Sequence, residues 1–110
     1  MNNFDALAEF EKEFNRLFKK YKTLDDDFEK FRKVLLATPT GIGKNFIIIH
    51  SSSSVKIVKA RMACRALRDR SLRIIYAYRV AVSKVEFIEI YFKGEKENED
   101  RERIKEYLKI

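Results

Sequence analysis

The chain has 110 residues, 45% of them hydrophobic, a length and composition that predict one globular domain spanning residues 1–110. Its single cysteine, Cys64, excludes an internal disulfide framework, and the single histidine, His50, disfavours a metal site built on Cys or His. No apolar run approaches the ~20 residues of a membrane span, and the N-terminus is too charged for a signal peptide. We therefore expect a soluble, cytoplasmic protein that needs no cofactor and no membrane.

The net charge of +7 is concentrated in the middle of the chain. Residues 39–84 carry ten lysines and arginines against one acid, Asp69, whereas acids and bases nearly balance on either side. A cationic field of this kind favours a polyanionic partner, either nucleic acid or an acidic peptide. A plain solvated strand face would give the same pattern, so both interpretations stay open at this point.

The N-terminal third predicts two consecutive helices. From residue 7 to residue 22, large apolar side chains recur at steps of three and four, the spacing of one face of an α-helix. A second helix is predicted from Thr23, which can cap it with Asp26 at the capping-box position, to about Ala37. The two helices form a hairpin whose apolar stripes need a sheet to cover them. Residues 3–6 could begin the first helix or form a short edge strand.

The segment from Thr38 to Asn45 reads T-P-T-G-I-G-K-N and resembles the phosphate-binding loop of helicase-type ATPases. That loop requires a strand before it and a helix after it, which aim backbone N–H groups at phosphate. Here a predicted helix precedes the segment, a strand-like run over residues 46–50 follows it, and Asn45 replaces the hydroxyl that would hold magnesium. We therefore expect a plain loop that binds no nucleotide.

Three further strands are predicted over residues 56–67, 72–79 and 85–93, where apolar and polar side chains alternate. One face of the first strand should enter the core with Val58, Ala60, Met62, Cys64 and Ala66. The other face carries Lys59, Arg61 and Arg65, to which the following strands add Arg73, Tyr76, Tyr78, Tyr91 and Lys93. The alternation predicts a sheet with one apolar face and one cationic face.

After Gly94, a charged turn leads to a short predicted helix over residues 99–108. The complete order is a helix hairpin, three or four antiparallel strands and a short C-terminal helix. This order predicts an α+β fold in which the hairpin packs on a small, twisted antiparallel sheet.

At this point the chain resembles the RelE/ParE superfamily, the toxins of type II toxin–antitoxin systems. The family's lysine-rich helix hairpin is similar to F-E-K-E-F-N-R-L-F-K-K-Y-K-T-L-D-D-D-F-E-K-F in this sequence. Its second and third strands are similar to V-K-I-V-K-A-R-M-A-C-R-A-L-R-D-R-S-L-R-I-I-Y-A-Y, and its last strand and basic turn to F-I-E-I-Y-F-K-G-E-K-E-N-E-D-R-E-R-I. The resemblance spans nearly the whole chain and implies a RelE/ParE-like fold.

RelE-type members are metal-independent, ribosome-dependent endoribonucleases that cut mRNA in the ribosomal A site and inhibit translation, so the resemblance implies this activity. It implies that Arg73 stabilises charge on the scissile phosphate, a role that suits a guanidinium fork. The other catalytic positions that it implies are Arg68, Lys93 and Lys96. Further RNA contacts are expected from Lys59, Arg61, Arg65 and Tyr91.

The sequence departs from the family where prototypic members carry closely spaced lysines, because Cys64 and Ala66 stand there. Arginine is a poor general base, so one of Lys59, Lys93 and Lys96 is the better candidate for accepting a proton. ParE-type relatives share the fold, lack the nuclease residues and inhibit DNA gyrase by binding. A ParE-like gyrase inhibitor and a degenerate nucleic-acid-binding member of the fold are therefore the alternatives to the nuclease.

The resemblance also implies the partners of the chain. RelE-type toxins act on the ribosome and its mRNA, and each is neutralised by a cognate antitoxin. We expect an acidic, partly helical antitoxin, disordered when free, that wraps the cationic strands and forms a toxin–antitoxin hetero-oligomer.

Overall fold

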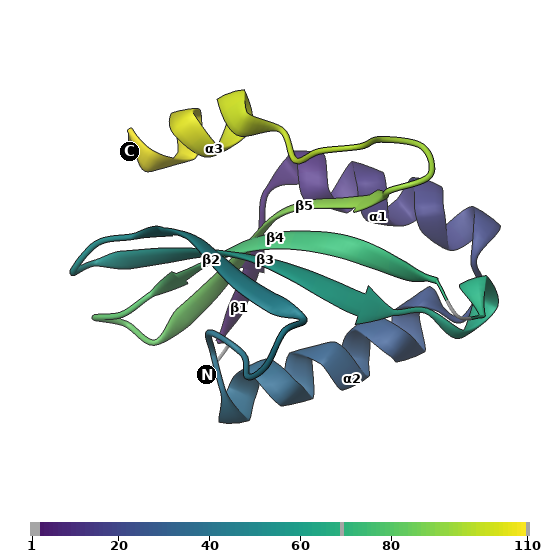
Figure 1. The fold of residues 1–110 in the computed structure, drawn as a ribbon, viewed down its shortest axis with the longest axis horizontal. Coiled ribbons are helices and arrows are strands. Elements are labelled where there is room, and N and C mark those ends of the chain that lie inside the picture. The colour runs from purple at the N-terminus through teal and green to yellow at the C-terminus, as the bar shows by residue number, and fades with distance from the viewer. Residues whose placement is uncertain (1–2, 69, 110) are drawn as a thin grey trace.

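The computed structural model describes residues 3–68 and 70–109, which contain three α-helices and five strands (Figure 1). In chain order the elements are β1 (Phe4–Ala6), α1 (Ala8–Lys20), α2 (Leu24–Ala37), β2 (Phe46–Ser51), β3 (Val55–Ala63), the 3₁₀ turn η1 (Arg65–Leu67), β4 (Ser71–Arg79), β5 (Lys84–Phe92) and α3 (Arg101–Leu108). The α+β class is thus confirmed. Among the described residues, no helix is long and apolar enough to cross a membrane.

The strands form one mixed sheet in the order β1-β5-β4-β3-β2. β1 runs parallel to β5, with Phe4 opposite Val85, and the other neighbouring strands are antiparallel. The expected antiparallel strands are therefore confirmed in β2 to β5, but the expectation that they make up the whole sheet is wrong, because the segment before α1 adds a fifth, parallel edge strand. The edge-strand alternative for residues 3–6 and the strand predicted at 46–50 are both confirmed. Residues 38–45 form the expected loop.

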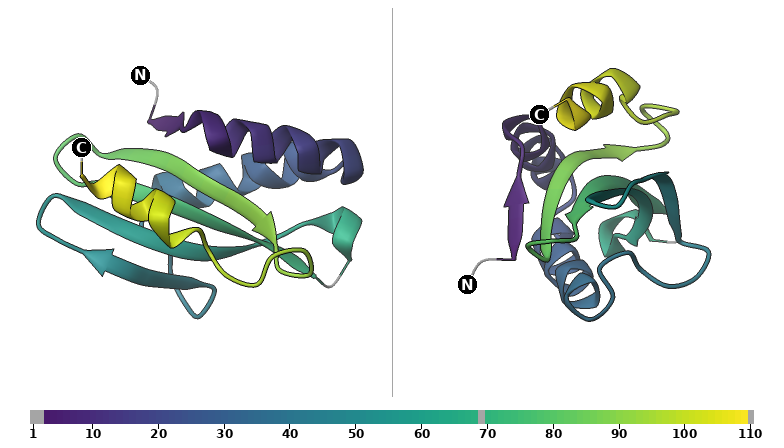
Figure 2. Two further views of the ribbon diagram at one scale, coloured as in Figure 1. Left: turned by 90° about the horizontal axis from the view of Figure 1, so that it is seen from above. Right: turned by 90° about the vertical axis from the view of Figure 1, so that its left-hand side faces the viewer.

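Helices α1 and α2 lie on one side of the sheet and α3 lies on the other (Figure 2). The predicted apolar stripes are confirmed, since the side chains buried in this layer include Phe10, Leu17, Leu24, Phe31 and Leu35. However, α1 packs mainly against β5, whereas α2 packs against β3 and η1. Each helix covers its own part of the sheet, an arrangement that differs from the predicted hairpin.

Strand β3 ends at Ala63 rather than at residue 67, because α2 binds the chain that follows. The buried carboxylate of Asp27 accepts hydrogen bonds from the backbone N–H and the Nε of Arg65, at 2.9 and 3.0 Å. The hydroxyl of Thr23 accepts one from the N–H of Ala66, at 3.0 Å, and makes no helix-capping bond. These bonds bend the chain into η1, so the predictions that Ala66 enters the core and that Arg65 extends the cationic strand face are wrong.

The second face of the sheet is only partly cationic, because α3 covers much of it. Ile104 and Tyr107 of α3 pack on an apolar cluster formed by Val55, Ile57, Ile75, Ala77, Ile88 and Tyr91. The prediction of one apolar and one cationic face therefore holds only beyond the end of α3, where Lys59, Arg61 and Arg73 follow the apolar residues along β3 and β4. The expectation that Tyr76 and Tyr78 belong to the cationic face is wrong, because both pack in the core layer beneath α1 and α2. Helix α3 begins at Arg101, and the side chain of Asp100 caps it.

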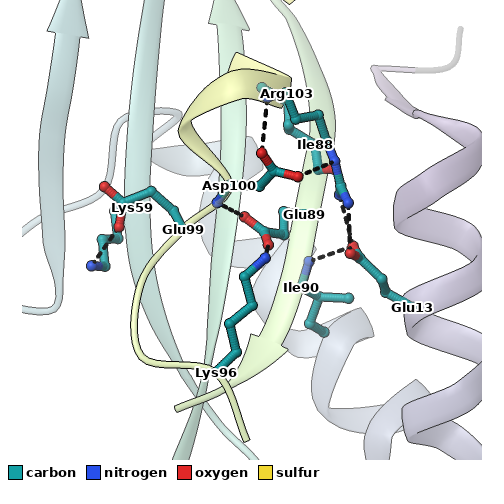
Figure 3. Close-up of polar contacts among 9 residues, drawn as sticks. All are labelled: Glu13, Lys59, Ile88, Glu89, Ile90, Lys96, Glu99, Asp100 and Arg103. Atoms are coloured by element: carbon teal, nitrogen blue, oxygen red, sulfur yellow. Dashed lines mark hydrogen bonds and ion pairs between the residues drawn. The ribbon is translucent and has the colours of Figure 1, made fainter. Parts of the chain in front are cut away.

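Charged side chains connect α3 and the segment before it to the sheet and to α1 (Figure 3). The fully buried carboxylate of Glu89 pairs with Lys96 and accepts a hydrogen bond from the N–H of Asp100, at 2.8 Å. Arg103 donates two hydrogen bonds to Glu13 of α1, at 3.0 and 2.8 Å. We call residues 93–100, between β5 and α3, the strap.

Candidate nucleic-acid interface

Two arginines face each other on the part of the sheet that α3 leaves open. Arg61 of β3 and Arg73 of β4 are direct cross-strand partners. Like charges placed directly opposite each other destabilise a sheet, and neither arginine is paired with a carboxylate among the described residues. Burial, together with the charge of Arg61, lowers the pKa of Arg73, although a guanidinium remains protonated at neutral pH. An anion placed between the two arginines would relieve their repulsion.

The Arg73 guanidinium is held in position by its own strand. Its Nη1 donates hydrogen bonds to Oγ and to the carbonyl oxygen of Ser71, at 2.8 and 3.3 Å. Only one of its terminal nitrogens is used in this way. The remaining N–H groups have no partner among residues 3–68 and 70–109, so within this part of the chain they are available for an oxyanion, and a guanidinium fork matches two phosphate oxygens.

Two adjoining depressions meet at these arginines, and both are lined by Arg61, Arg73 and Lys93. The first depression is completed by Arg70, Ser71, Phe92 and Gly94, and the second by Lys44, Asn45, Ile47, Lys59 and Ala60. We call the combined surface the arginine groove. Its cations are Lys44, Lys59, Arg61, Arg70, Arg73 and Lys93. A concave surface lined by cations is suited to the phosphates of a nucleic acid backbone.

Two of these cations, Lys44 and Arg70, were not predicted as site residues. Lys44 belongs to the loop after α2, which returns beside β3, where the N–H of Arg61 donates to the carbonyl of Asn45 at 2.9 Å. Arg70 lies one residue before β4, and its guanidinium carbon lies 5.7 Å from the ring centroid of Phe92. The proximity of Arg70 to β4 in the sequence could have indicated that it lines the groove. No pattern in the sequence predicts that Lys44 lies there.

Of the predicted site residues, the structure brings together Lys59, Arg61, Arg73 and Lys93. It does not bring Arg65 and Arg68 to the groove, because Arg65 binds Asp27 beside α2 and Arg68 lies in the exposed turn after η1. Lys96 pairs with Glu89, and its Nζ lies 5.6 Å from the ring centroid of Tyr91.

Tyr91 lies beneath the groove instead of on its surface. The residue is only 3% exposed, and its hydroxyl makes no hydrogen bond of regular geometry among the described residues. The ring packs in the apolar cluster under α3, so it offers no open face on which a base could stack. An RNA contact through the Tyr91 ring therefore does not fit this geometry.

Lys59 differs from the other groove cations because it already has an acidic partner. Its Nζ lies 2.9 Å from Oε1 of Glu99, and this hydrogen bond raises the pKa of Lys59. A lysine whose ammonium form is stabilised is a poor general base at neutral pH. The structure therefore favours Lys59 as a cation that binds phosphate and argues against it as the residue that accepts a proton.

The arrangement can hold phosphate and can stabilise negative charge that develops on it. Among residues 3–68 and 70–109, the structure contains no group of three or more His, Cys, Asp or Glu side chains that could hold a metal ion. His50 lies on the exposed strand β2 and does not line the groove. No known family model matches the sequence, and no curated protein matches it.

Proposed function

We propose that this chain is the toxin of a type II toxin–antitoxin module and that it binds mRNA in the arginine groove and cuts it on the ribosome, as RelE-like toxins do. The observation that carries the proposal is the cross-strand pair of Arg61 and Arg73, which has no carboxylate partner among the described residues. Such a pair costs stability in the free protein, a cost that an anionic ligand would remove. The choice of RNA as the substrate, of the ribosome as the place of cleavage and of the cytoplasm as the location rests on the sequence resemblance.

In this proposal Arg61 and Arg73 hold the scissile phosphate, and Arg73 binds the charge that builds on its oxygens as the 2′-hydroxyl attacks. Lys93 lines both parts of the groove next to the two arginines. Its ammonium is suited to donate a proton to the 5′-oxygen that leaves. As the bond from the 2′-oxygen to phosphorus forms and the bond from phosphorus to the 5′-oxygen breaks, the proton of the 2′-hydroxyl passes to solvent water, and the products are a 2′,3′-cyclic phosphate and a free 5′-hydroxyl. Lys59 and Lys44, at the far end of the groove, bind neighbouring phosphates.

The proposed antitoxin is an acidic segment that adds a strand to β2 and reaches into the groove. β2 is an edge strand of the sheet, and the side chains of Ile47, Ile48 and Ile49 are 57%, 49% and 38% exposed. An exposed apolar edge is a template for an added strand. Ile47 also lines the arginine groove, so a strand bound there would place its acidic side chains beside Arg61.

The proposal is tested by inducing the chain alone in bacteria and mapping the ends of cellular mRNA. We expect new ends within translated codons, growth arrest, and rescue by the product of an adjacent acidic reading frame. Growth arrest with intact mRNA and inhibited DNA gyrase would instead support the ParE-like alternative. RNA binding without cleavage or growth arrest would support the degenerate nucleic-acid-binding alternative.

A further inference from the structure

A carboxylate at the rim of the arginine groove already occupies one of its cations. Lys59 lines the groove, yet its ammonium is paired with Glu99 of the strap (Figure 3). The Glu99 side chain is only 11% exposed, and its second oxygen lies 3.8 Å from Nε of Arg101. The other groove cations have no carboxylate partner among the described residues. Glu99 therefore stands where a ligand phosphate would otherwise pair with Lys59.

The fold holds Glu99 at this place. The next residue, Asp100, donates its N–H to the buried carboxylate of Glu89 at 2.8 Å and accepts a hydrogen bond from the N–H of Arg103 at 3.0 Å. Lys96, on the other side of Glu99, pairs with the same Glu89. A carboxylate fixed on both sides loses little further entropy when it pairs with Lys59, so it competes effectively with a mobile ligand.

A buried hydroxyl with an unused proton lies beside this ion pair. The Tyr91 hydroxyl makes no hydrogen bond of regular geometry among the described residues, although the Lys59 ammonium lies close enough to act on it both by its charge and by a weaker contact, and the charge of Glu99 acts on it as well. A contact in which Lys59 donates leaves the hydroxyl proton of Tyr91 unused. Burial raises the pKa of Tyr91, so the hydroxyl keeps its proton at neutral pH and remains a donor. An unused buried donor costs stability in the free protein. The cost would be removed in a ligand-bound state that gives the hydroxyl an acceptor.

We propose that Glu99 is a built-in competitor of the ligand phosphate, which must draw Lys59 away from it, and that the Tyr91 hydroxyl then donates to the released carboxylate. The exchange leaves each group with a partner, because Lys59 pairs with phosphate while Glu99 keeps Arg101 and gains Tyr91. The inference rests on the proposed function in taking RNA as the natural ligand. It predicts that the groove binds phosphate more weakly than its cations allow.

The test compares Glu99→Gln with Glu97→Gln in the full chain. Both variants remove one negative charge from the strap, but Glu97 is exposed and has no ion pair among the described residues. The probes are a ten-nucleotide single-stranded RNA and inorganic tripolyphosphate, with binding measured by calorimetry. Glu99→Gln should bind both probes about three- to tenfold more tightly, and Glu97→Gln should change binding less than about twofold. Glu99→Asp, which keeps the charge but shortens its reach, should give part of this gain.

Two further variants isolate the exchange. In a Lys59→Ala background, Glu99→Gln should give no more gain than Glu97→Gln, because no ammonium remains to be released. Tyr91→Phe should leave the melting temperature unchanged or higher, yet weaken RNA binding about two- to fivefold, because Glu99 then lacks its second partner.

Each outcome decides between the claims. Equal affinities of Glu99→Gln and Glu97→Gln, or a gain that persists without Lys59, would overturn the competitor role. If tripolyphosphate shows the gain and RNA does not bind, the proposed function fails while the competitor stands. If neither probe binds to any variant, both claims fail.

Discussion

The charges of Arg61 and Arg73 destabilise the sheet in which the two residues lie. They face each other across β3 and β4, and burial of Arg73 adds to the cost of keeping both charged. In the rest of β3 and β4, the local pattern and the fold agree, with Val58, Ala60 and Ile74 buried as alternation requires. A local conflict of this kind is expected at a functional site.

Asp27 is the residue whose loss should most disturb the junction between α2 and the end of β3. Asp27→Asn removes the charge that binds Arg65 and weakens the hydrogen bonds to the Thr23 hydroxyl and the Arg65 backbone. We expect a loss of about 1–3 kcal/mol in the free energy of unfolding at pH 7, measured by urea denaturation. Asp26→Asn is the control, because Asp26 is exposed and its contact with Arg65 is 3.5 Å long.

The same substitution has a pH dependence of known sign. Burial alone would raise the pKa of Asp27, but hydrogen bonds from the Arg65 backbone, Thr23 and the Arg65 side chain lower it below 3.8. A group whose pKa is lowered by folding stabilises the protein above its unfolded pKa, and loses this effect as the pH falls through the folded value. The difference between wild type and Asp27→Asn should therefore shrink below about pH 3.8. A difference that is constant with pH would contradict this role for the Asp27 charge.

At the scale of elements, the docking of α3 depends on Arg103. Its Nη1 also donates to the carbonyl of Ile88, at 2.9 Å, in addition to the bidentate contact with Glu13. Arg103→Ala removes the charged partner of the part-buried Glu13 carboxylate, which then keeps the N–H of Ile90 as its hydrogen-bond donor, so we expect a loss of about 2–3 kcal/mol in the free energy of unfolding. In the Arg103→Ala variant, the backbone amides of α3 should exchange their hydrogens faster than those of β4.

The matched control for this prediction lies on the same helix. Lys105 also forms an ion pair, with Glu102 at 3.5 Å, but both side chains are largely exposed. Lys105→Ala should change the free energy of unfolding by less than about 0.5 kcal/mol. Similar losses for the two variants would show that Arg103 does not hold α3 on the sheet.

The regular elements were largely predictable from the sequence because their signals are local. Helical spacing identified the buried faces of α1 and α2, and alternation identified most of β3, β4 and β5. The end of β3 was not predictable, since it depends on Asp27, 38 residues before Arg65.

The site was predictable only in part, because local signals can be recognised in the sequence and long-range contacts cannot. Arg61 and Arg73 follow from alternation, whereas the pairing of Lys59 with Glu99 depends on how the strap crosses the sheet.

For the whole molecule, the charge distribution predicts how RNA binding responds to salt. The arginine groove gathers six cations on one side of the sheet, beyond the end of α3. If about four of them contact phosphates, the logarithm of the affinity for single-stranded RNA should fall with a slope of about −3 against the logarithm of salt concentration. Titrations of a short RNA at several salt concentrations measure this slope. A nearly flat dependence would argue for a protein target instead of RNA.

The central claim is that the arginine groove binds and cleaves RNA, and Arg73→Ala tests it most directly. Leu72 and Ile74 keep the strand buried, and removing one of two opposed charges should leave the melting temperature unchanged or slightly higher. Lys30→Ala, which removes one exposed charge from α2, is the matched control.

The measurement is the rate of mRNA cleavage on programmed ribosomes by wild type and by both variants. Loss of one preorganised donor to a developing oxyanion costs about 2.7–4 kcal/mol, so Arg73→Ala should cut roughly a hundred to a thousand times more slowly. Lys30→Ala should cut at the wild-type rate. Cleavage by a folded Arg73→Ala variant at the wild-type rate would contradict the account.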